Sequence, residues 1–265
     1  MLDLRDLHKT FNPGTINEKK ALVGLSLHLD PGDYVTVIGG NGAGKSTMLN
    51  AIAGVWPVDR GRIILDGKDI TALPEYKRAG LIGRVFQDPM LGTAPNMQLE
   101  ENLALAIRRG ERRGLRWNVT KAEREVFHER LKELGLGLED RMSAKVGLLS
   151  GGQRQAVTLL MAVLKQPKLL LLDEHTAALD PATAAKVLEL SDRIVNENHL
   201  TALMITHNMR DAIRHGNRLI MMNEGEIILD VRGEEKARLT KHELMDKFAA
   251  LSGVQIDSDQ VLLSK

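Results

Sequence analysis

The chain has 265 residues but no cysteine, no long hydrophobic run and a net charge of only +1. Without cysteine it forms no disulfides, which fits a reducing compartment. Its longest apolar runs, such as residues 169–172, are far too short to span a bilayer. The small net charge gives no electrostatic case for a nucleic-acid partner, and residues 1–6 lack the basic and apolar regions of a signal peptide. We therefore expect a soluble, cytoplasmic protein whose membrane role comes through a partner.

The chain also lacks internal repeats and low-complexity tracts. A hydrophobic content of 43% is ample for a core, and the length suits one large α/β domain or one domain with an inserted lobe. Residues 1–88 are rich in strand and turn patterns, whereas residues 89–148 carry helical patterns over 99–109 and 120–134, the second opened by a capping box. Further strands are predicted over residues 168–173, 200–206 and 218–223, followed by a hairpin at Glu224-Gly225.

The most informative stretch matches the phosphate-binding loop pattern G-x-x-x-x-G-K-[ST]. Its glycines let successive backbone N–H groups point at one anion, Lys45 adds a charge for the outer phosphates, and the Ser46 hydroxyl is placed to ligate Mg²⁺. A strand predicted over residues 34–38 and a helix over 45–53 flank the loop as the motif requires. The predicted ATP-binding residues here are Gly39, Gly40, Asn41, Gly42, Ala43, Gly44, Lys45, Ser46 and Thr47.

An apolar strand predicted over residues 168–173 ends in two carboxylates, Asp173 and Glu174. Adjacent residues on a strand point in opposite directions, so one acid can serve Mg²⁺ while the other faces an attacking water. We assign Asp173 to the metal and Glu174 as the general base. The alternative is an ordinary strand end with solvated acids, which the presence of a phosphate-binding loop disfavours.

A second phosphate-binding element precedes the helical run over residues 154–165. Ser150 is the predicted N-cap of that run. Gly151 and Gly152 let the backbone approach an anion at a helix N-terminus. With Gln153 these residues complete the predicted ATP-binding set, so one chain carries two phosphate elements but only one full nucleotide site.

Residues 149–153 read Leu-Ser-Gly-Gly-Gln, and this chain resembles the ATPase subunits of ATP-binding cassette (ABC) transporters, whose signature sequence is the same. The resemblance covers roughly residues 1–230. It implies an α/β fold with a P-loop NTPase core, a mostly parallel sheet, an antiparallel β subdomain and an inserted α-helical subdomain. The expected domains are residues 1–232, with the helical subdomain at about 89–150, and a tail over 233–265 with an amphipathic helix at 241–251.

The resemblance assigns roles to four further residues, each by its register within the family pattern. Phe11 resembles the aromatic residue that stacks on adenine, although a core position beneath the first strand is the alternative. Gln87 resembles the glutamine that senses Mg²⁺ and couples to the membrane partner. Asp180 lies in the loop that crosses the dimer interface, and His207 resembles the histidine that contacts the γ-phosphate.

The resemblance also implies the partners. Two copies are expected to stack head to tail with ATP and Mg²⁺ between each phosphate-binding loop and the other copy's signature helix. A separate membrane permease would place the chain at the inner face of the membrane, and the branch it resembles pairs with a lipid-anchored, extracytoplasmic substrate-binding protein and is associated with amino acids. No nucleic-acid partner is expected. The alternatives are the ATPase of an exporter or lipid-release system, and a soluble ABC ATPase such as those of iron–sulfur assembly.

Two features depart from the family pattern or stand outside it. His175 and Ala177 occupy positions where most members carry proline and serine. His175 either tunes the catalytic carboxylate, meets the partner subunit or is a tolerated variant in a tight turn. A basic cluster beside Trp117 is interpreted as a solvated loop, with anionic headgroups or nucleic acid as the alternative. That cluster contains Arg108, Arg109, Arg112, Arg113 and Arg116.

Overall fold

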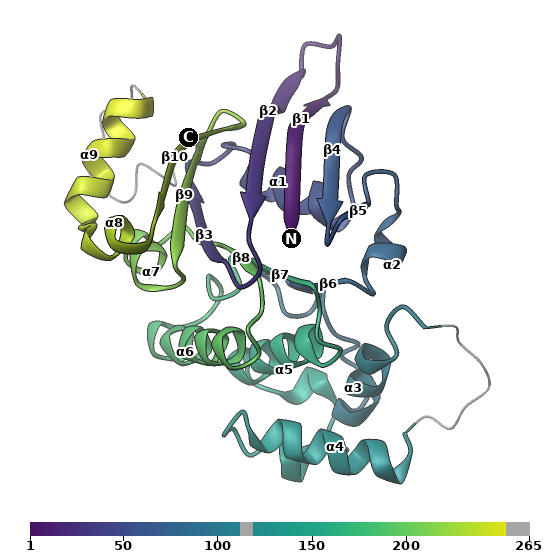
Figure 1. Cartoon of the computed structure of the whole chain (residues 1–265). Helices are drawn as coiled ribbons and strands as arrows, with labels where there is room; N and C mark the ends of the chain where they lie inside the picture. Colours follow the sequence, from purple (N-terminus) through teal and green to yellow (C-terminus); the bar gives the residue numbers. More distant parts are fainter. Residues whose placement is uncertain (112–118, 253–265) are drawn as a thin grey trace. The chain divides into compact units, whose positions relative to one another are not determined.

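The computed structural model describes residues 1–111 and 119–252 (Figure 1). These residues form two compact units, one containing Met1–Arg78 with the described residues from Leu200 onward, and one containing Ala79–His199. The helical subdomain predicted at about residues 89–150 lies inside the second unit. The basic-cluster residues Arg112, Arg113, Arg116 and Trp117 and the tail beyond Ser252 lie outside the described residues.

The first unit contains a four-stranded antiparallel sheet in the order β2-β1-β4-β5 (Figure 1). Leu2, Leu4 and Leu7 of β1 are all buried, although the step from Leu4 to Leu7 breaks the two-residue period of a strand. A register shift between these two residues restores Leu7 to the buried face. The strands are β1 (Leu2–Phe11), β2 (Lys19–Leu29), β4 (Arg60–Leu65) and β5 (Lys68–Asp69), the last two joined by a tight turn.

A second group of strands in this unit runs in the order β10-β9-β3-β8. β3 is parallel to both β8 and β9, and β9 and β10 form the predicted antiparallel hairpin. Every residue of β3 before Gly39 is buried, as expected of a central parallel strand. The strands are β3 (Tyr34–Gly39), β8 (Ala202–Ile205), β9 (Arg218–Asn223) and β10 (Glu226–Arg232).

Helices complete the first unit. Helix α1, which follows the phosphate-binding loop, contacts β2 and β3. The predicted amphipathic helix near the C-terminus is confirmed as α9, whose Leu244 and Phe248 join a buried cluster with Met209, Leu219 and Val231. The helices are α1 (Lys45–Ala53), α2 (Glu75–Arg78), α7 (Met209–Arg214), α8 (Gly233–Arg238) and α9 (Lys241–Ser252).

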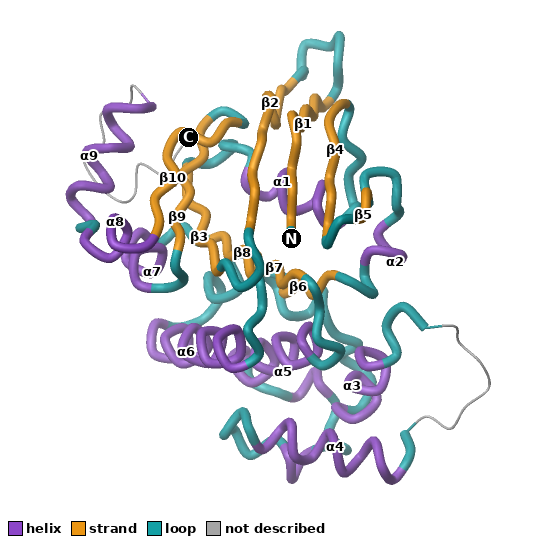
Figure 2. The backbone as a smooth tube through the Cα atoms, viewed as in Figure 1, coloured by secondary structure: helices purple, strands orange, loops and turns teal. Residues whose placement is uncertain are grey.

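The second unit is mainly helical, with one pair of parallel strands (Figure 2). Helix α5 contacts β6, α3, α4 and α6 and is therefore the centre of the packing. The capping box predicted at Thr120 is confirmed. The elements are β6 (Ile82–Val85), α3 (Leu99–Ile107), α4 (Lys121–Lys132), α5 (Gly151–Val163), β7 (Leu169–Asp173), α6 (Pro181–Glu197) and two short 3₁₀ turns, Glu139–Arg141 and Val146–Leu148.

These elements confirm the predicted α/β fold class. Parallel pairing occurs around β3 and between β6 and β7, and the chain also contains the antiparallel sheet β2-β1-β4-β5. The N-cap predicted at Ser150 is confirmed, but the helical run predicted to follow it begins three residues earlier than expected. The signature helix starts at Gly151 rather than Arg154, because Ser150 caps it and the two glycines form its first turn. Within residues 1–111 and 119–252, none of the helices has both the length and the apolarity that crossing a bilayer requires.

Arg78 closes the C-terminal end of α1 from inside the first unit. Its side chain is 2% exposed. Nη1 donates to the carbonyl oxygens of Ala51 and Ile52 at 2.7 and 2.9 Å, where a helix end leaves carbonyls without partners. Nε donates to Leu73 and Nη2 to Thr71, each at 2.8 Å. One buried cation therefore stabilises both the helix behind the phosphate-binding loop and the chain that follows β5.

We predict that Arg78→Met lowers the free energy of unfolding by at least about 3 kcal/mol, because four charge-assisted hydrogen bonds are lost and buried carbonyls stay unpaired. Urea unfolding followed by circular dichroism measures the change. Arg62→Met, at an exposed position of β4, is the matched control and is expected to stay within about 0.5 kcal/mol of wild type. Equal effects of the two substitutions would contradict the role of Arg78.

Candidate nucleotide-binding and catalytic site

The phosphate-binding loop joins β3 to α1 and is held by backbone from two other segments. A Cβ atom on Gly39 would lie 2.3 Å from the carbonyl oxygen of Met222 in β9. Gly44 has φ 98°, and a Cβ there would lie 2.5 Å from the carbonyl oxygen of Ala21 in β2. Both positions therefore require glycine, for close approach as well as for backbone conformation.

The loop presents donors to an anion. The amide of Gly225, in the β9–β10 turn, donates to the carbonyl of Ala43 at 3.0 Å and fixes the loop from outside. Gly44 is the N-cap of α1 and has no side chain to cap the helix, so no N-cap side chain competes with a phosphate for the first turn. Lys45 Nζ donates to the carbonyls of Gly39 and Gly40 at 2.7 and 3.0 Å, which keeps the ammonium at the loop.

Phe11 lies at the end of β1 and is half-buried. Its ring makes an edge-to-face contact with Trp56, at 5.0 Å between centroids, and Lys9 Nζ lies 5.6 Å from its centroid. Phe11 pairs across the sheet with Lys19, and a Cβ on Gly42 would lie 3.0 Å from Lys19 Nζ. Phe11 therefore lies opposite a residue whose side chain reaches the phosphate-binding loop. Lys19, which the sequence interpretation missed, adds positive charge there.

His207 follows β8 in the same unit and is exposed. The amide of the preceding residue, Thr206, donates to the carbonyl of Val37 in β3 at 3.1 Å. The next residue, Asn208, caps α7 by accepting from the amides of Arg210 and Asp211 at 2.9 and 3.4 Å. Both neighbours of His207 are thus fixed to regular structure, and the first unit carries Phe11, residues 39–47 and His207 of the predicted set.

The second unit carries the remaining predicted residues, and β6 and β7 bring two of their segments together. The parallel register pairs Val85 with Leu172, so the segment ahead of Gln87 lies beside the strand end at Asp173. Arg84 Nη2 donates to Asp173 Oδ2 at 3.2 Å, and its guanidinium carbon lies 4.5 Å from the Phe86 ring centroid. Arg84, a charged residue inside an apolar strand, was the sequence signal for this contact and was missed.

The reasoning that separated the two acids by strand alternation is wrong. β7 ends at Asp173, and Glu174 has φ 43°, a left-handed conformation outside the strand. The relative direction of the two carboxylates is therefore set by the turn at Glu174 and not by strand alternation. The amide of Ala177 donates to the carbonyl of Glu174 at 2.9 Å and closes that turn. The roles proposed for both acids stay predictions.

The signature motif is the N-terminus of α5. Ser150 accepts from the amide of Gln153 at 3.2 Å, and the Gln153 side chain accepts from the amide of Ser150 at 3.2 Å, which is a complete capping box. A Cβ on Gly152 would lie 2.2 Å from Thr183 Cγ2, so α6 packs directly on this glycine. Asp180 Oδ1 caps α6 by accepting a hydrogen bond from the amide of Thr183 at 3.1 Å. Hydrogen bonds from Thr183 lower the pKa of the Asp180 carboxyl.

Two side chains of α5 connect the signature to the segment after β6. Gln155 Nε2 donates to the carbonyl of Phe86 at 3.2 Å, directly before Gln87. Arg154 contacts Met90 Sδ at 2.8 Å and donates to the carbonyls of Gly147 and Leu149. Helix α5 thus connects the signature motif to the segment of Gln87, and Arg84 connects that segment to the end of β7.

Comparison with known proteins agrees with this arrangement. The family model described as ABC transporter matches residues 22–177. The chain belongs to the ABC transporter family. As an ABC ATPase it binds and hydrolyses ATP.

Individual matches extend over nearly the whole ABC ATPase chain. The tyrosine transport ATP-binding protein of Clostridioides difficile is 46% identical over 253 residues, which cover 94% of this chain and 98% of that protein. The spermidine/putrescine import ATP-binding protein of Mesoplasma florum is 34% identical over 231 residues, or 86% of this chain and 60% of that protein. A dimeric, post-hydrolysis ATP-binding cassette bound to ADP and inorganic phosphate matches with a TM-score of 0.75 and 29% identity, over 88% of this chain and 98% of that one.

The predicted magnesium ligands of this ABC ATPase are the Ser46 hydroxyl, the Gln87 amide and the Asp173 carboxylate. Mg²⁺ takes hard oxygen donors, often one or two from protein, and completes its octahedron with phosphate oxygens and water. No group of three or more His, Cys, Asp or Glu among the described residues is arranged to hold a metal. Ser46, Gln87 and Asp173 each offer a side-chain oxygen, the donor type that Mg²⁺ prefers, and binding by these three residues remains a prediction.

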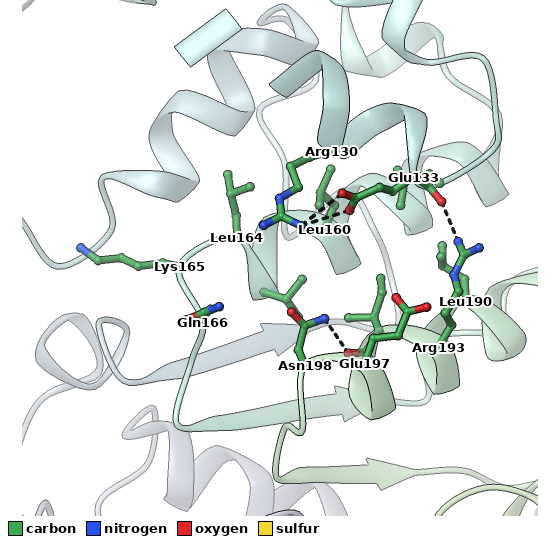
Figure 3. A pocket seen from close by; sticks show the side chains of 13 residues that line it. Arg130, Glu133, Leu160, Leu164, Lys165, Gln166, Leu190, Arg193, Glu197 and Asn198 are labelled. Atoms are coloured by element: carbon green, nitrogen blue, oxygen red, sulfur yellow. Dashed lines mark hydrogen bonds and ion pairs between the residues drawn. The ribbon is translucent and has the colours of Figure 1, made fainter. Parts of the chain in front are cut away.

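The second unit also contains a cavity of about 440 Å³ lined by α4, α5, α6 and the segments that follow α5 and α6 (Figure 3). Arg130 and Glu133 form an ion pair at its rim, at 3.2 Å, and Arg193 donates to the Glu133 carbonyl at 2.7 Å. None of the predicted site residues lines this cavity. The cavity is therefore not formed by any of the predicted site residues.

Asp211 lies one turn beyond His207, and the pKa of its carboxyl allows a test of how burial affects charge in α7. Burial raises the pKa of the Asp211 carboxyl, while the charges of His215, His207 and Arg214 oppose the shift. A native-state pKa above the unfolded one means that the folded chain loses stability as pH rises through this interval. We predict that Asp211→Asn is stabilising at pH 7 and that its advantage shrinks toward about pH 4.

Thermal unfolding of both proteins across this pH range measures the effect. Asp69→Asn is the matched control, because hydrogen bonds from the Thr71 hydroxyl and amide lower the pKa of Asp69. That substitution should be destabilising at pH 7, with the penalty fading as pH falls. An Asp211→Asn advantage that does not change with pH would show that burial of the charge is not its cause.

Proposed function

We propose that this ABC ATPase is the energy-coupling subunit of an importer, works as a head-to-tail dimer and drives a separate membrane permease from its cytoplasmic face. The observation that carries the proposal is the presence of two phosphate elements of different design in one chain. The first, before α1, leaves its helix N-terminus uncapped. The second, before α5, is capped by Ser150 and has a glycine exposed at its start. A dimer lets each complete the other copy's site.

In the proposed reaction, ATP lies with its phosphates on the N–H groups of residues 39–47 and its adenine against Phe11. Glu174 accepts a proton from the attacking water, and His207 contacts the γ-phosphate. Held by Ser46, Gln87 and Asp173, Mg²⁺ would neutralise charge developing between the β- and γ-phosphates. The hydrogen bond from Arg84 to one oxygen of Asp173 orients that carboxylate at the strand end.

The permease is proposed to dock on an apolar patch formed by Met90, Leu91 and Leu148, which we name the coupling patch. Leu91 and Leu148 are 70% and 73% exposed, unusual for leucine, and Met90 is 39% exposed. Arg154 contacts Met90 and the carbonyls beside Leu148, so the patch is fixed to the signature helix. A permease bound to the coupling patch would therefore be close in the chain to both Gln87 and the signature motif.

Import of an amino acid is the proposed transport task. The support is the 46% identity to a tyrosine transport ATP-binding protein over nearly the full length of both chains. The match to a polyamine import ATPase supports import but a different cargo. Cargo is recognised by the permease and a substrate-binding protein, so residues of this chain carry no contact with it. The identity of the partner therefore discriminates import from the exporter, lipid-release and soluble alternatives.

Glu174→Gln should bind ATP and form the ATP-bound dimer but hydrolyse ATP about 10²- to 10⁴-fold more slowly, because the amide cannot accept the proton of the attacking water. Phosphate release under single-turnover conditions measures the rate, and gel filtration with ATP measures the dimer. Glu189→Gln, at an exposed position of α6, is the control. Turnover at the wild-type rate in Glu174→Gln would remove Glu174 from the mechanism.

The partner is tested with tagged Glu174→Gln protein in ATP and Mg²⁺, used to capture proteins from detergent-solubilised membranes of the native host. Mass spectrometry should identify a multi-span permease together with a lipid-anchored binding protein. Leu91→Glu in the same background should lose the permease while retaining the ATP-bound dimer, because a charge is placed in an apolar contact. Val126→Glu, on the exposed side of α4, should lose nothing.

A permease with large extracytoplasmic domains and no binding protein would favour the exporter or lipid-release alternative. Capture of soluble proteins alone, with the dimer formed normally, would favour the soluble class. Capture of the permease by Leu91→Glu at the level of Val126→Glu would place the docking surface elsewhere.

A further inference from the structure

His175 stands directly after Glu174 and is 2% exposed. Its Nε2 lies 2.9 Å from the Oγ of Ser191, which is fully buried in α6. Ser191 Oγ in turn donates to the carbonyl of Val187 at 2.9 Å. A hydroxyl has one proton, and this bond uses it, so the ring nitrogen is the donor to Ser191. His175 therefore joins the loop after β7 to the interior of α6.

The loop needs such an attachment. Glu174 is in the left-handed conformation, which costs a non-glycine residue about 1–2 kcal/mol and persists only where surrounding structure enforces it. Within residues 174–180, His175 alone is buried, and the residues after it are half-buried or exposed. The hydrogen bond from Ala177 to the Glu174 carbonyl closes the turn but does not itself reach beyond it. His175 is the buried side chain that attaches the turn to the interior of α6.

Helix α6 is a firm anchor for this contact. Its N-terminus is capped by Asp180, with Pro181 in the first turn. Thr183 packs against Gly152 of the signature helix, and Val187, Ser191 and Val195 are buried along its length. A side chain that donates to α6 therefore takes its position from the body of the second unit rather than from an exposed loop.

We propose that His175 is a positioning residue for hydrolysis: its hydrogen bond to Ser191 fixes the turn that aims the Glu174 carboxylate. The inference rests on the proposed role of Glu174 as general base. His175 does not touch ATP in this proposal and takes no proton from water. Its contribution is geometric, and a carboxylate displaced by about 1 Å is sufficient to lower a rate by up to about 10²-fold.

The test uses the full chain with three substitutions. His175→Ala removes the ring, and Ser191→Ala removes only its acceptor. His175→Gln keeps an N–H donor in about the position of Nε2. We expect kcat to fall about 10- to 100-fold in the two alanine variants, with KM for ATP within about twofold of wild type, and to recover in the glutamine variant. His175→Asn, whose shorter side chain cannot reach Ser191, is the matched control for His175→Gln and should not recover.

A double-mutant cycle separates positioning from general loss of structure. If His175 acts through Glu174, adding His175→Ala to Glu174→Gln should lower the residual single-turnover rate no further. An equal further loss in that background would overturn the proposal, as would an unchanged kcat in both alanine variants or a loss of ATP binding in Ser191→Ala. Should His175→Ala not fold, Ser191→Ala and the glutamine–asparagine pair still distinguish positioning from loss of structure.

Failure of the proposed function would look different. In that case Glu174→Gln itself would turn over normally, whichever residue stands at position 175. Wild-type turnover in His175→Ala together with an inactive Glu174→Gln would instead leave the general base in place and remove only the positioning role.

Discussion

The nucleotide site depends on close packing of the phosphate-binding loop against the backbone of neighbouring strands. The loop between β3 and α1 can lie where it does because Gly39 and Gly44 let it approach carbonyls of β9 and β2 more closely than any side chain allows. The β9–β10 turn adds a hydrogen bond from Gly225. The loop, β2 and the β9–β10 hairpin therefore define one cradle, and its shape is set before a phosphate arrives.

The second unit is organised by side chains that reach across to other segments. From α5, Gln155 binds the carbonyl of Phe86, and Arg154 binds the carbonyls ahead of the signature. From the loop after β7, His175 reaches α6. These contacts make the signature helix, the segment of Gln87 and the turn of Glu174 one connected body.

Sequence patterns predicted the elements that local chemistry determines. The bounds of α1, the capping box at Thr120, the N-cap at Ser150 and the strand ending at Asp173 follow from composition and spacing over a few residues. The contact of Lys19 with the loop could not be predicted, because it joins parts of the chain that no local pattern connects. Arg84 did carry a signal, a charge inside an apolar strand, but that signal does not name Asp173 as the partner. The turn at Glu174 was missed for another reason: glutamate carries no local signal for a left-handed conformation.

The first unit is assembled from both ends of the chain, with Ala79–His199 inserted between its halves. β3, the strand that leads into the phosphate-binding loop, is made early, yet both strands that flank it, β8 and β9, come after the insertion. During translation β3 therefore cannot pair with β8 or β9 while the second unit is being synthesised. The nascent chain cannot hold ATP in a finished cradle until translation has passed the β9–β10 turn, so the ability to bind nucleotide reports that both strands flanking β3 have been made.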